Sequence, residues 1–213
     1  MEQSKIVVVD DHPLMRQGII QLLALEPSFE VVGEASCGEG ALDVVLKQEP
    51  DVVLMDLNMK GMDGIESLKL LRQHDVDAKI IMFTVSDENE DVLNALRNGA
   101  DGYLLKDMEP EELLQRLRTA VSGQMVLSPE LMHILALELR NERNPPQLGS
   151  LTKREKEILK QIAVGQSNKQ IARKFDITEG TVKVHVKNLL KKMKLRSRVE
   201  AAVWAVENKA ELR

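Results

Sequence analysis

The stretch Ile6-Val7-Val8-Val9-Asp10-Asp11-His12-Pro13 decides the fold of the first part of the chain. Four β-branched residues in a row are typical of a short strand that is covered on both faces, as strands are in parallel sheets. Two aspartates follow this run directly, and a helical pattern begins after them, at about residues 13–25. A buried strand followed at once by a helix predicts one unit of an α/β sheet.

The same alternation continues outward from this stretch over the first ~120 residues. Further short strands are predicted at Glu30–Val32, Val52–Met55, Lys79–Phe83 and Gly102–Leu105. Helical patterns lie between and after them, at roughly 39–48, 63–73, 88–97 and 110–121. Alternation at this spacing predicts a five-stranded parallel sheet with helices on both sides.

Polar residues directly follow the predicted strands. Because ligands of such sheets bind at the carboxyl ends of the strands, we expect these residues to converge: Asp10, Asp11, Asp56, Thr84 and Lys106. Carboxylates that are forced together repel each other, and a hard cation such as Mg²⁺ would relieve the repulsion. A carboxylate can also act as a nucleophile and form an aspartyl phosphate, with Lys106 and Thr84 binding phosphoryl oxygens. Alternatively, the acidic residues only cap helices, although five suitable residues at successive strand ends disfavour that interpretation.

The pattern changes after Gly123. Pro129–Glu142 is predicted as a helix with Leu131, Ile134, Leu135 and Leu139 on one side, and Asn144–Ser150, with two prolines and a glycine, as an extended connector. We therefore divide the chain into a domain at 1–122, a helical linker and connector at 123–147, and a domain at 148–213. Charge supports the division: residues 149–213 hold 16 basic and 7 acidic residues, and residues 1–148 hold 13 basic and 27 acidic ones. A basic small domain is suited to binding polyanions.

The second domain contains a candidate reading helix at 178–193. Thr178 is a good N-cap, and one helix face gathers the apolar residues Val182, Val186, Leu189, Leu190 and Met193. The opposite face gathers Gly180, Lys183, Val184, Lys187 and Lys191. A valine placed among lysines is what a major-groove reader would use against a thymine methyl group. The alternative is a solvated basic face, but the short helix Asn168–Phe175 and the tight connection after it predict a helix-turn-helix.

The strand-end motifs resemble those of the receiver domain of two-component response regulators, over about residues 4–122. They are Val9-Asp10-Asp11-His12-Pro13, Met55-Asp56-Leu57-Asn58-Met59, Phe83-Thr84-Val85-Ser86 and Leu105-Lys106-Asp107. The resemblance implies a flavodoxin-like (βα)₅ fold with Asp56 as phosphoacceptor. It also implies that Asp11, Asp56 and the backbone carbonyl of Asn58 hold Mg²⁺, with Asp10 assisting. Thr84 and Tyr103 would be switch residues, and Lys106 would bind the phosphoryl group. Tyr103 can equally be a partly buried aromatic at the end of the sheet.

Residues 148–210 resemble the LuxR-type output domain, a four-helix helix-turn-helix unit. The motifs are Leu151-Thr152-Lys153-Arg154-Glu155, Ser167-Asn168-Lys169-Gln170-Ile171-Ala172 and Thr181-Val182-Lys183-Val184-His185-Val186. Both resemblances together define the NarL/FixJ family. They imply a sensor histidine kinase, an operator in double-stranded DNA, a homodimer on DNA and RNA polymerase as partners. Residues 99–107 and 183–203 are similar to the nitrate/nitrite regulators of the NarL and NarP type, and Lys60 and Val85-Ser86-Asp87 favour the NarP type.

Two other functions are compatible with parts of the sequence. One is a Mg²⁺-dependent phosphohydrolase with an aspartate nucleophile, although haloacid-dehalogenase-type enzymes carry an Asp-x-Asp motif on their first strand. The other is an interaction module that does not bind DNA, which the basic second domain disfavours. The family resemblance implies a phosphoacceptor that assists its own phosphotransfer and dephosphorylation, and not an enzyme.

The sequence also suggests a cellular compartment. Cys37 is the only cysteine, so an internal disulfide is impossible and a reducing cytoplasm is the simplest location. The chain has no apolar run of the ~20 residues that span a bilayer. The apolar run Ile6–Val9 is too short, and too soon followed by aspartates, for a signal peptide. We expect a cytoplasmic protein with no membrane partner.

Overall fold

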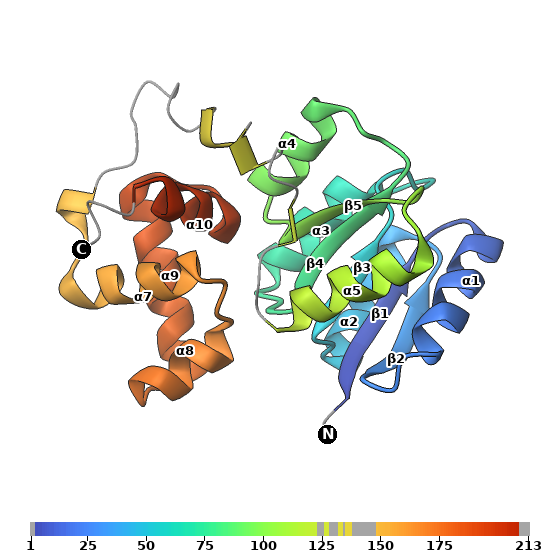
Figure 1. The fold of residues 1–213 in the computed structure, drawn as a ribbon, viewed down its shortest axis with the longest axis horizontal. Helices are drawn as coiled ribbons and strands as arrows, with labels where there is room; N and C mark the ends of the chain where they lie inside the picture. Colours follow the sequence, from blue (N-terminus) through green and yellow to red (C-terminus); the bar gives the residue numbers. More distant parts are fainter. Residues whose placement is uncertain (1–2, 123–125, 128–131, 134, 138–147, 209–213) are drawn as a thin grey trace. The chain divides into compact units, whose positions relative to one another are not determined.

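The structure is a computed structural model that describes residues 3–122, 126–127, 132–133, 135–137 and 148–208. The chain divides into two compact units, Met1–Val121 and Ser122–Arg213. Both are shown in Figure 1. Among the helices of the described residues, none is long and apolar enough to cross a membrane.

The first unit alternates strands and helices. Its strands are β1 (Ser4–Val9), β2 (Phe29–Ala35), β3 (Val52–Met55), β4 (Lys79–Thr84) and β5 (Gly102–Leu105). Its helices are α1 (Pro13–Ala24), α2 (Gly38–Gln48), α3 (Gly64–Gln73), α4 (Asn89–Arg97) and α5 (Pro110–Val121). All strand pairs are parallel and the order is β2-β1-β3-β4-β5. The predicted α/β, flavodoxin-like fold class is confirmed.

The strand order places the ends of β1 and β3 at the point where the direction of winding reverses. The chain moves from β1 outward to β2 and then continues from β3 on the other side of β1. Val9 pairs with Met55, so the next residues, Asp10 and Asp56, follow a paired position in adjacent strands. In open α/β sheets this reversal point is where ligands bind.

The apolar strands are buried on both faces because helices cover the sheet on both sides. β3 is buried throughout, as are Ile6 to Val9 of β1. Helices α2, α3 and α4 pack side by side, and α5 is linked to the end of α1 by the ion pair Arg118–Glu26 (Figure 1). Double coverage explains why these strands read as continuous apolar runs and not as alternating ones.

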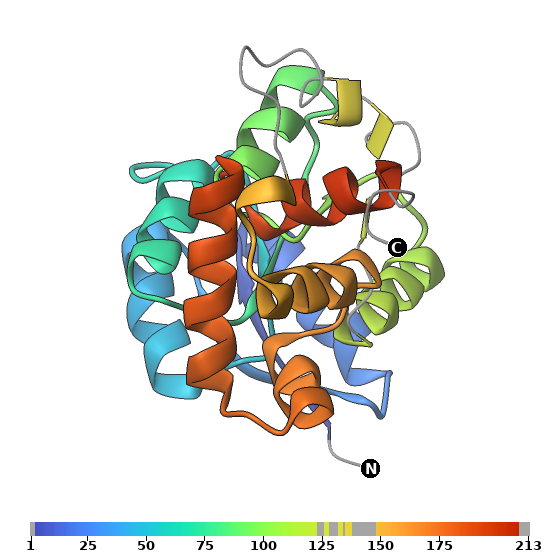
Figure 2. The ribbon, with the colours of Figure 1, turned by 90° about the vertical axis from the view of Figure 1, so that its left-hand side faces the viewer.

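The second unit is helical. Its elements are the short 3₁₀ turn η1 (Leu148–Ser150), α7 (Lys153–Ala163), α8 (Asn168–Phe175), α9 (Glu179–Met193) and α10 (Arg198–Glu207). A side-chain cap marks the start of each of these α-helices. The capping side chain accepts a hydrogen bond from the backbone N–H of the residue three positions later, and the caps are Thr152, Ser167, Thr178 and Ser197. Helices α7, α8 and α10 all contact α9, which runs through the unit (Figure 2).

Two sequence predictions need comment. Thr84 was expected to follow the fourth strand, but it is the last residue of β4, because its backbone still pairs with Leu105 of β5. The predicted helix Pro129–Glu142 falls mostly outside the described residues. Residues 132–133 and 135–137 are helical, and the connector up to residue 147 is not described.

Candidate functional site

The structure brings together the predicted carboxylates at the carboxyl ends of β1 and β3. Ligand atoms of Asp10, Asp11, His12 and Asp56 lie within 4.8 Å of one another. Asp10 and Asp56 are 1% and 4% exposed. Both are held by the sheet itself, since the Asp56 N–H donates to the Val9 carbonyl at 2.8 Å and the Asp10 N–H to the Ala35 carbonyl at 3.1 Å. The cluster is therefore a fixed part of the sheet edge.

Lys106 supplies a positive charge within the cluster. Its Nζ lies 2.8 Å from Oδ2 of Asp10 and 2.8 Å from Oδ2 of Asp56, and its side chain is 6% exposed. The backbone N–H of Lys106 donates to the Thr84 carbonyl at 2.8 Å, which fixes where the side chain starts. One ammonium group among three carboxylates leaves the site with an excess of negative charge.

The ionisation of Asp56 reflects this environment. Burial raises the pKa of the Asp56 carboxyl above its ordinary value. The Lys106 ammonium, through a hydrogen bond and its charge, acts against that increase, and the carboxylate of Asp10 adds to it. The Asn58 N–H also hydrogen-bonds Asp56 and favours the ionised form. Asp56 is therefore a buried carboxyl group that Lys106 holds in place.

The oxygen atoms of the cluster suit a hard divalent cation. Asp11 Oδ1 is buried and accepts no hydrogen bond from the described residues. The Nδ1 of His12, the N-cap residue of α1, lies 2.8 Å from Asp11 Oδ1, a distance that gives an ion pair when the imidazole is protonated. The other oxygen, Asp11 Oδ2, accepts from the Lys60 N–H at 3.2 Å. A buried carboxylate oxygen that accepts no hydrogen bond, beside two more carboxylates, fits Mg²⁺.

Glycine 64 fixes the loop that carries Asp56 and Asn58. Its N–H donates to the Leu57 carbonyl at 2.8 Å. A Cβ at position 64 would lie 2.3 Å from the Asp56 carbonyl oxygen and 2.8 Å from the Leu57 Cα. Only glycine lets the start of α3 come this close to the loop, so the position of Asp56 depends on Gly64.

The residues expected to act as switches meet at Ser86, a motif residue to which the sequence assigns no role of its own. The Ser86 N–H donates to the Thr84 hydroxyl at 3.3 Å, and the Tyr103 hydroxyl donates to the Ser86 carbonyl at 2.9 Å. The Ser86 hydroxyl donates to Asp91 of α4 at 2.6 Å. Tyr103 is 4% exposed, and burial raises its pKa to about 12. Thr84, Tyr103 and the start of α4 are thus connected through one residue.

Arg16 is a second residue that the sequence did not reveal. Its Nη1 donates to the backbone carbonyl of Asp10 at 2.6 Å, and its Nε donates to Oε2 of Glu34 at 2.7 Å. These contacts tie α1 and β2 to the end of β1. Nothing in the spacing of Asp10, Arg16 and Glu34 along the chain predicts that they meet.

The candidate DNA-reading face lies on α9. Val182, Leu189 and Met193 are buried, and Val186 and Leu190 are half-buried, so the predicted core stripe does face inward. On the opposite face Val184 is 58% exposed. Lys187 and Lys191 are also exposed and Lys183 is half-buried. An exposed valine flanked by lysines can contact a base methyl group while its neighbours contact base edges or phosphates.

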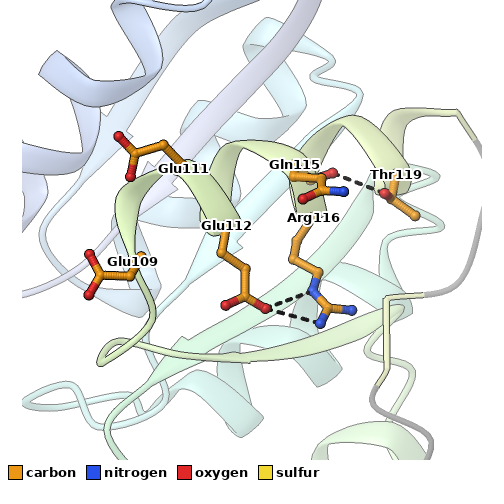
Figure 3. Close-up of a pocket in the computed structure, with 6 residues that line it drawn as sticks. All are labelled: Glu109, Glu111, Glu112, Gln115, Arg116 and Thr119. Carbon is orange, nitrogen blue, oxygen red and sulfur yellow. Dashed lines mark hydrogen bonds and ion pairs between the residues drawn. The ribbon is translucent and has the colours of Figure 1, made fainter.

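A pocket on the surface of α5 is separate from the acidic cluster. All of its lining residues belong to α5 or immediately precede it, and Figure 3 shows them: Glu109, Glu111, Glu112, Gln115, Arg116 and Thr119. Arg116 pairs with Glu112 at 3.0 Å, and Thr119 donates to the Gln115 carbonyl at 2.9 Å. These are ordinary pairs one turn apart on an exposed helix face, and the pocket offers no nucleophile or metal-binding group that converges with another element.

Both halves of the chain match known families. Residues 6–118 match the response regulator receiver domain, and residues 149–205 match the bacterial regulatory proteins of the luxR family. The matches favour neither a phosphohydrolase nor an interaction module that does not bind DNA.

Similar proteins extend the match over the whole chain. The chain is 54% identical to the nitrate/nitrite response regulator protein NarL of Escherichia coli strain K12, over 95% of both chains. It is 46% identical to the nitrate/nitrite response regulator protein NarP of that strain, over 96% of this chain and 95% of NarP. Overall identity is thus higher to NarL, against the preference for the NarP type drawn from Lys60 and residues 85–87.

A solved structure supports the same conclusion. The response regulator ChrA of a heme-sensing two-component system is 31% identical to this chain, covers all of both chains and gives a TM-score of 0.53. Fold, strand-end residues and similarity over the full length agree. The chain belongs to the response regulators that combine a receiver domain with a LuxR-type DNA-binding domain.

Proposed function

We propose that a sensor histidine kinase phosphorylates the chain on Asp56, and that phosphorylation controls operator binding by α9. The observation that carries the first part is the position of Lys106, 2.8 Å from both Asp10 and Asp56. An ammonium group shared between the proposed acceptor and a neighbouring carboxylate can move to a phosphoryl oxygen without leaving the site. Thr84, buried at the end of β4, can donate its hydroxyl to another oxygen.

In this reaction a carboxylate oxygen of Asp56 attacks phosphorus. The new O–P bond forms as the P–N bond of the phosphohistidine donor breaks, and the electron pair of that bond returns to the imidazole. Asp10, Asp11, Asp56 and the Asn58 carbonyl would hold Mg²⁺. When bound, Mg²⁺ offsets the negative charge of the transferring group. Asp56 is thus the phosphoacceptor, and the protein assists its own phosphotransfer and dephosphorylation without being an enzyme for other substrates.

The second part of the proposal concerns the output. The domains are residues 1–122 for the receiver, 123–147 for the linker and 148–213 for DNA binding. Phosphorylation draws Thr84 toward the phosphoryl group, which removes the hydroxyl from Ser86 and releases Tyr103. The receiver then ceases to mask Lys183, Val184, Lys187 and Lys191, and the chain binds its operator as a homodimer and contacts RNA polymerase. Similarity to NarL and NarP favours nitrate/nitrite control of anaerobic respiration in the cytoplasm.

The assignment of Asp56 is tested by labelling. Native protein and Asp56→Asn are incubated with radiolabelled acetyl phosphate and Mg²⁺, and Asp43→Asn, an exposed carboxylate of α2, serves as the control. Native protein and the control should take up label in the presence of Mg²⁺ and lose that ability in EDTA. Asp56→Asn should take up none. Stoichiometric label on Asp56→Asn would refute the assignment.

The regulatory assignment is tested on DNA and in cells. Selection from random duplexes, with and without acetyl phosphate, should recover a two-fold symmetric site mainly with the phosphorylated protein. Footprinting on the source genome should then locate the same site. In cells, the fraction of phosphorylated protein should rise with nitrate or nitrite in the medium. If the phosphorylated fraction does not change with either anion, the nitrate/nitrite assignment is refuted, whereas the response-regulator function is not.

A further inference from the structure

The first turn of α7 contacts both helices of the helix-turn-helix. Arg154 donates through Nη2 to the Phe175 carbonyl at the end of α8, at 3.1 Å, and its guanidinium lies over the Phe175 ring at 4.2 Å. The next residue, Glu155, accepts from Lys192 in the last turn of α9, at 2.9 Å to Oε1 and 2.8 Å to Oε2. Two adjacent residues in the first turn of α7 therefore contact the C-terminal ends of α8 and α9.

Glu155 is buried by these contacts. It is 3% exposed, and its Oε2 also accepts from the Thr152 N–H at 2.7 Å, which completes the capping box of α7. A buried carboxylate requires a partner charge, and Lys192 is the partner that the structure gives it. The ion pair consequently fixes the last turn of α9 relative to the start of α7.

Lys192 lies away from the proposed DNA-reading face of α9. At 100° per residue it lies roughly 140° around α9 from Lys187, whereas Lys191 lies only about 40° from it. Both lysines are exposed, but Lys191 lies on the same side as Val184, whereas the Lys192 ammonium pairs with Glu155. The two neighbouring lysines of one helix thus lie on different sides of it, and Lys192 is the one paired with Glu155.

We propose that Arg154 and Glu155 form a clamp that positions the recognition helix α9, and that Lys192 acts through Glu155 and not on a DNA phosphate. The inference rests on the proposed DNA-binding face of α9. It adds that α9 presents Lys183, Val184 and Lys187 correctly only while its last turn is held to α7. Glu155 and Lys192 are then positioning residues for base reading, and Arg154 holds the end of α8 beside them.

The two lysines provide matched variants. Full-length native protein, Lys191→Met and Lys192→Met, each treated with acetyl phosphate and Mg²⁺, are titrated with a random-sequence duplex at several KCl concentrations. Loss of a phosphate contact should reduce the slope of log affinity against log salt by about one. The slope should fall for Lys191→Met and stay native for Lys192→Met. An equal fall for Lys192→Met would overturn the inference, whereas absence of DNA binding by native protein would instead overturn the proposed function.

A second comparison tests the positioning role. Glu155→Gln removes the charge but can keep the capping box, because Gln170 completes the same kind of box with Ser167 at the start of α8. The ratio of affinity for the selected duplex to that for the random duplex should fall about 3- to 10-fold in Glu155→Gln and in Lys192→Met. The ratio for the double variant, which carries both Glu155→Gln and Lys192→Met, should fall no further than the ratio for either single variant. An unchanged ratio in both single variants would show that the pair does not position α9.

A third measurement needs no DNA. Trp204, the single tryptophan of the chain, lies in α10 and is buried, so its fluorescence reports unfolding of this unit. If Glu155 and Lys192 are coupled, the double variant should lose less stability in urea than the sum of the two single losses. Additive losses would mean that the ion pair does not exist in solution and would overturn the clamp.

Discussion

Lys106 Nζ and Asp56 Oδ2 lie 2.8 Å apart, with Asp10 Oδ2 at the same distance from Nζ. This contact joins the end of β5 to the end of β3 across the intervening strand β4. It concentrates charge in a buried place, because a single ammonium group faces several carboxylates. Such an arrangement costs stability in the absence of a cation or phosphoryl group and becomes useful when one binds.

The first prediction concerns the stability cost of Asp56. Burial raises its pKa in the folded state, whereas in the unfolded chain it titrates near its ordinary value. The folded protein therefore binds the proton more tightly. Protonation of Asp56 therefore stabilises the folded protein. This stabilisation is complete below the ordinary pKa and is lost as pH rises through the raised pKa. At pH 7, without Mg²⁺, Asp56→Asn should raise the free energy of unfolding on the order of 1 kcal/mol.

Urea unfolding of the native and Asp56→Asn proteins in EDTA measures this difference. The difference in unfolding free energy should shrink as the pH is lowered through the raised pKa, and it should be smallest below about 4, where Asp56 is protonated in both states. Asp43→Asn should match native protein at both pH values. A less stable Asp56→Asn protein at pH 7 would contradict a raised pKa.

The second prediction concerns the cation. Asp11 Oδ1 accepts no hydrogen bond from the described residues and faces His12 Nδ1 at 2.8 Å, so we expect Mg²⁺ to bind this oxygen. Asp11→Asn should weaken Mg²⁺ binding by at least roughly 10–100-fold, since the loss of even an outer-shell partner typically costs that much. Calorimetric titration with MgCl₂ measures the affinity, with Asp43→Asn as the control. Equal affinity in Asp11→Asn would exclude Asp11 as a ligand.

The third prediction concerns the loop after β3. In Gly64→Ala the new Cβ would meet the backbone of Asp56 and Leu57 at 2.3 Å and 2.8 Å, so the loop must move. We expect a loss of about 1–3 kcal/mol in stability, together with a slower rate of labelling by acetyl phosphate. Gly18→Ala in α1 is the matched control, because a Cβ there meets nothing within 4 Å and alanine favours the helix. If the two variants label equally fast, Gly64 does not position Asp56.

The sequence predicts contacts that depend on the backbone better than contacts between side chains. Alternating strands and helices place Asp10, Asp56 and Lys106 at one sheet edge whatever surrounds them, and the structure has them there. The cap at Thr178 likewise follows from a local rule, and the helices predicted at 168–175 and 178–193 agree closely with α8 and α9.

Residues that meet through long side chains from distant elements could not be predicted. Arg16 reaches the Asp10 carbonyl from α1, and Lys192 reaches Glu155 across 37 positions in the chain. Ser86 looks like an ordinary loop residue until Tyr103 and Asp91 are placed beside it. Such contacts depend on rotamers and on how helices pack, which periodicity does not encode.

The fourth prediction concerns base reading by α9. Lys187 and Val184 lie on its exposed face. Lys187→Ala should weaken binding to the selected duplex by about 1–3 kcal/mol if Lys187 contacts a base. Val184→Ala should relax the preference at one A·T pair, because a thymine methyl group loses its apolar partner, and should change non-specific affinity little. Quantitative binding to single-position variants of the duplex measures both effects. Native discrimination in both variants would mean that this face is only solvated.

The last prediction concerns the masking of α9 by the receiver. Residues 1–148 are acidic and residues 149–213 are basic, so opposite charge favours a closed form that salt should weaken. Phosphorylation replaces the single negative charge of the Asp56 carboxylate with about two on the phosphoryl group and moves Thr84, and a difference of a few kcal/mol between closed and open forms suffices to exchange their populations. Residues 148–213 alone should therefore bind the selected duplex without phosphorylation, and full-length protein should match them only when it is phosphorylated.

The comparison requires the fragment, the unphosphorylated protein and the phosphorylated protein at matched salt, over a range of KCl concentrations. The ratio of the DNA affinity of the fragment to that of the unphosphorylated protein should fall toward one as KCl rises. Using this ratio at each KCl concentration corrects for the loss of DNA affinity that salt causes in the fragment itself. Asp56→Asn with acetyl phosphate is the control, and it should stay in the weakly binding form. Equal affinity of the fragment and the unphosphorylated protein would exclude masking, because the receiver would then not lower the DNA affinity of α9. In that case phosphorylation would have to act by joining two receivers, and affinity would depend on protein concentration in the phosphorylated state alone.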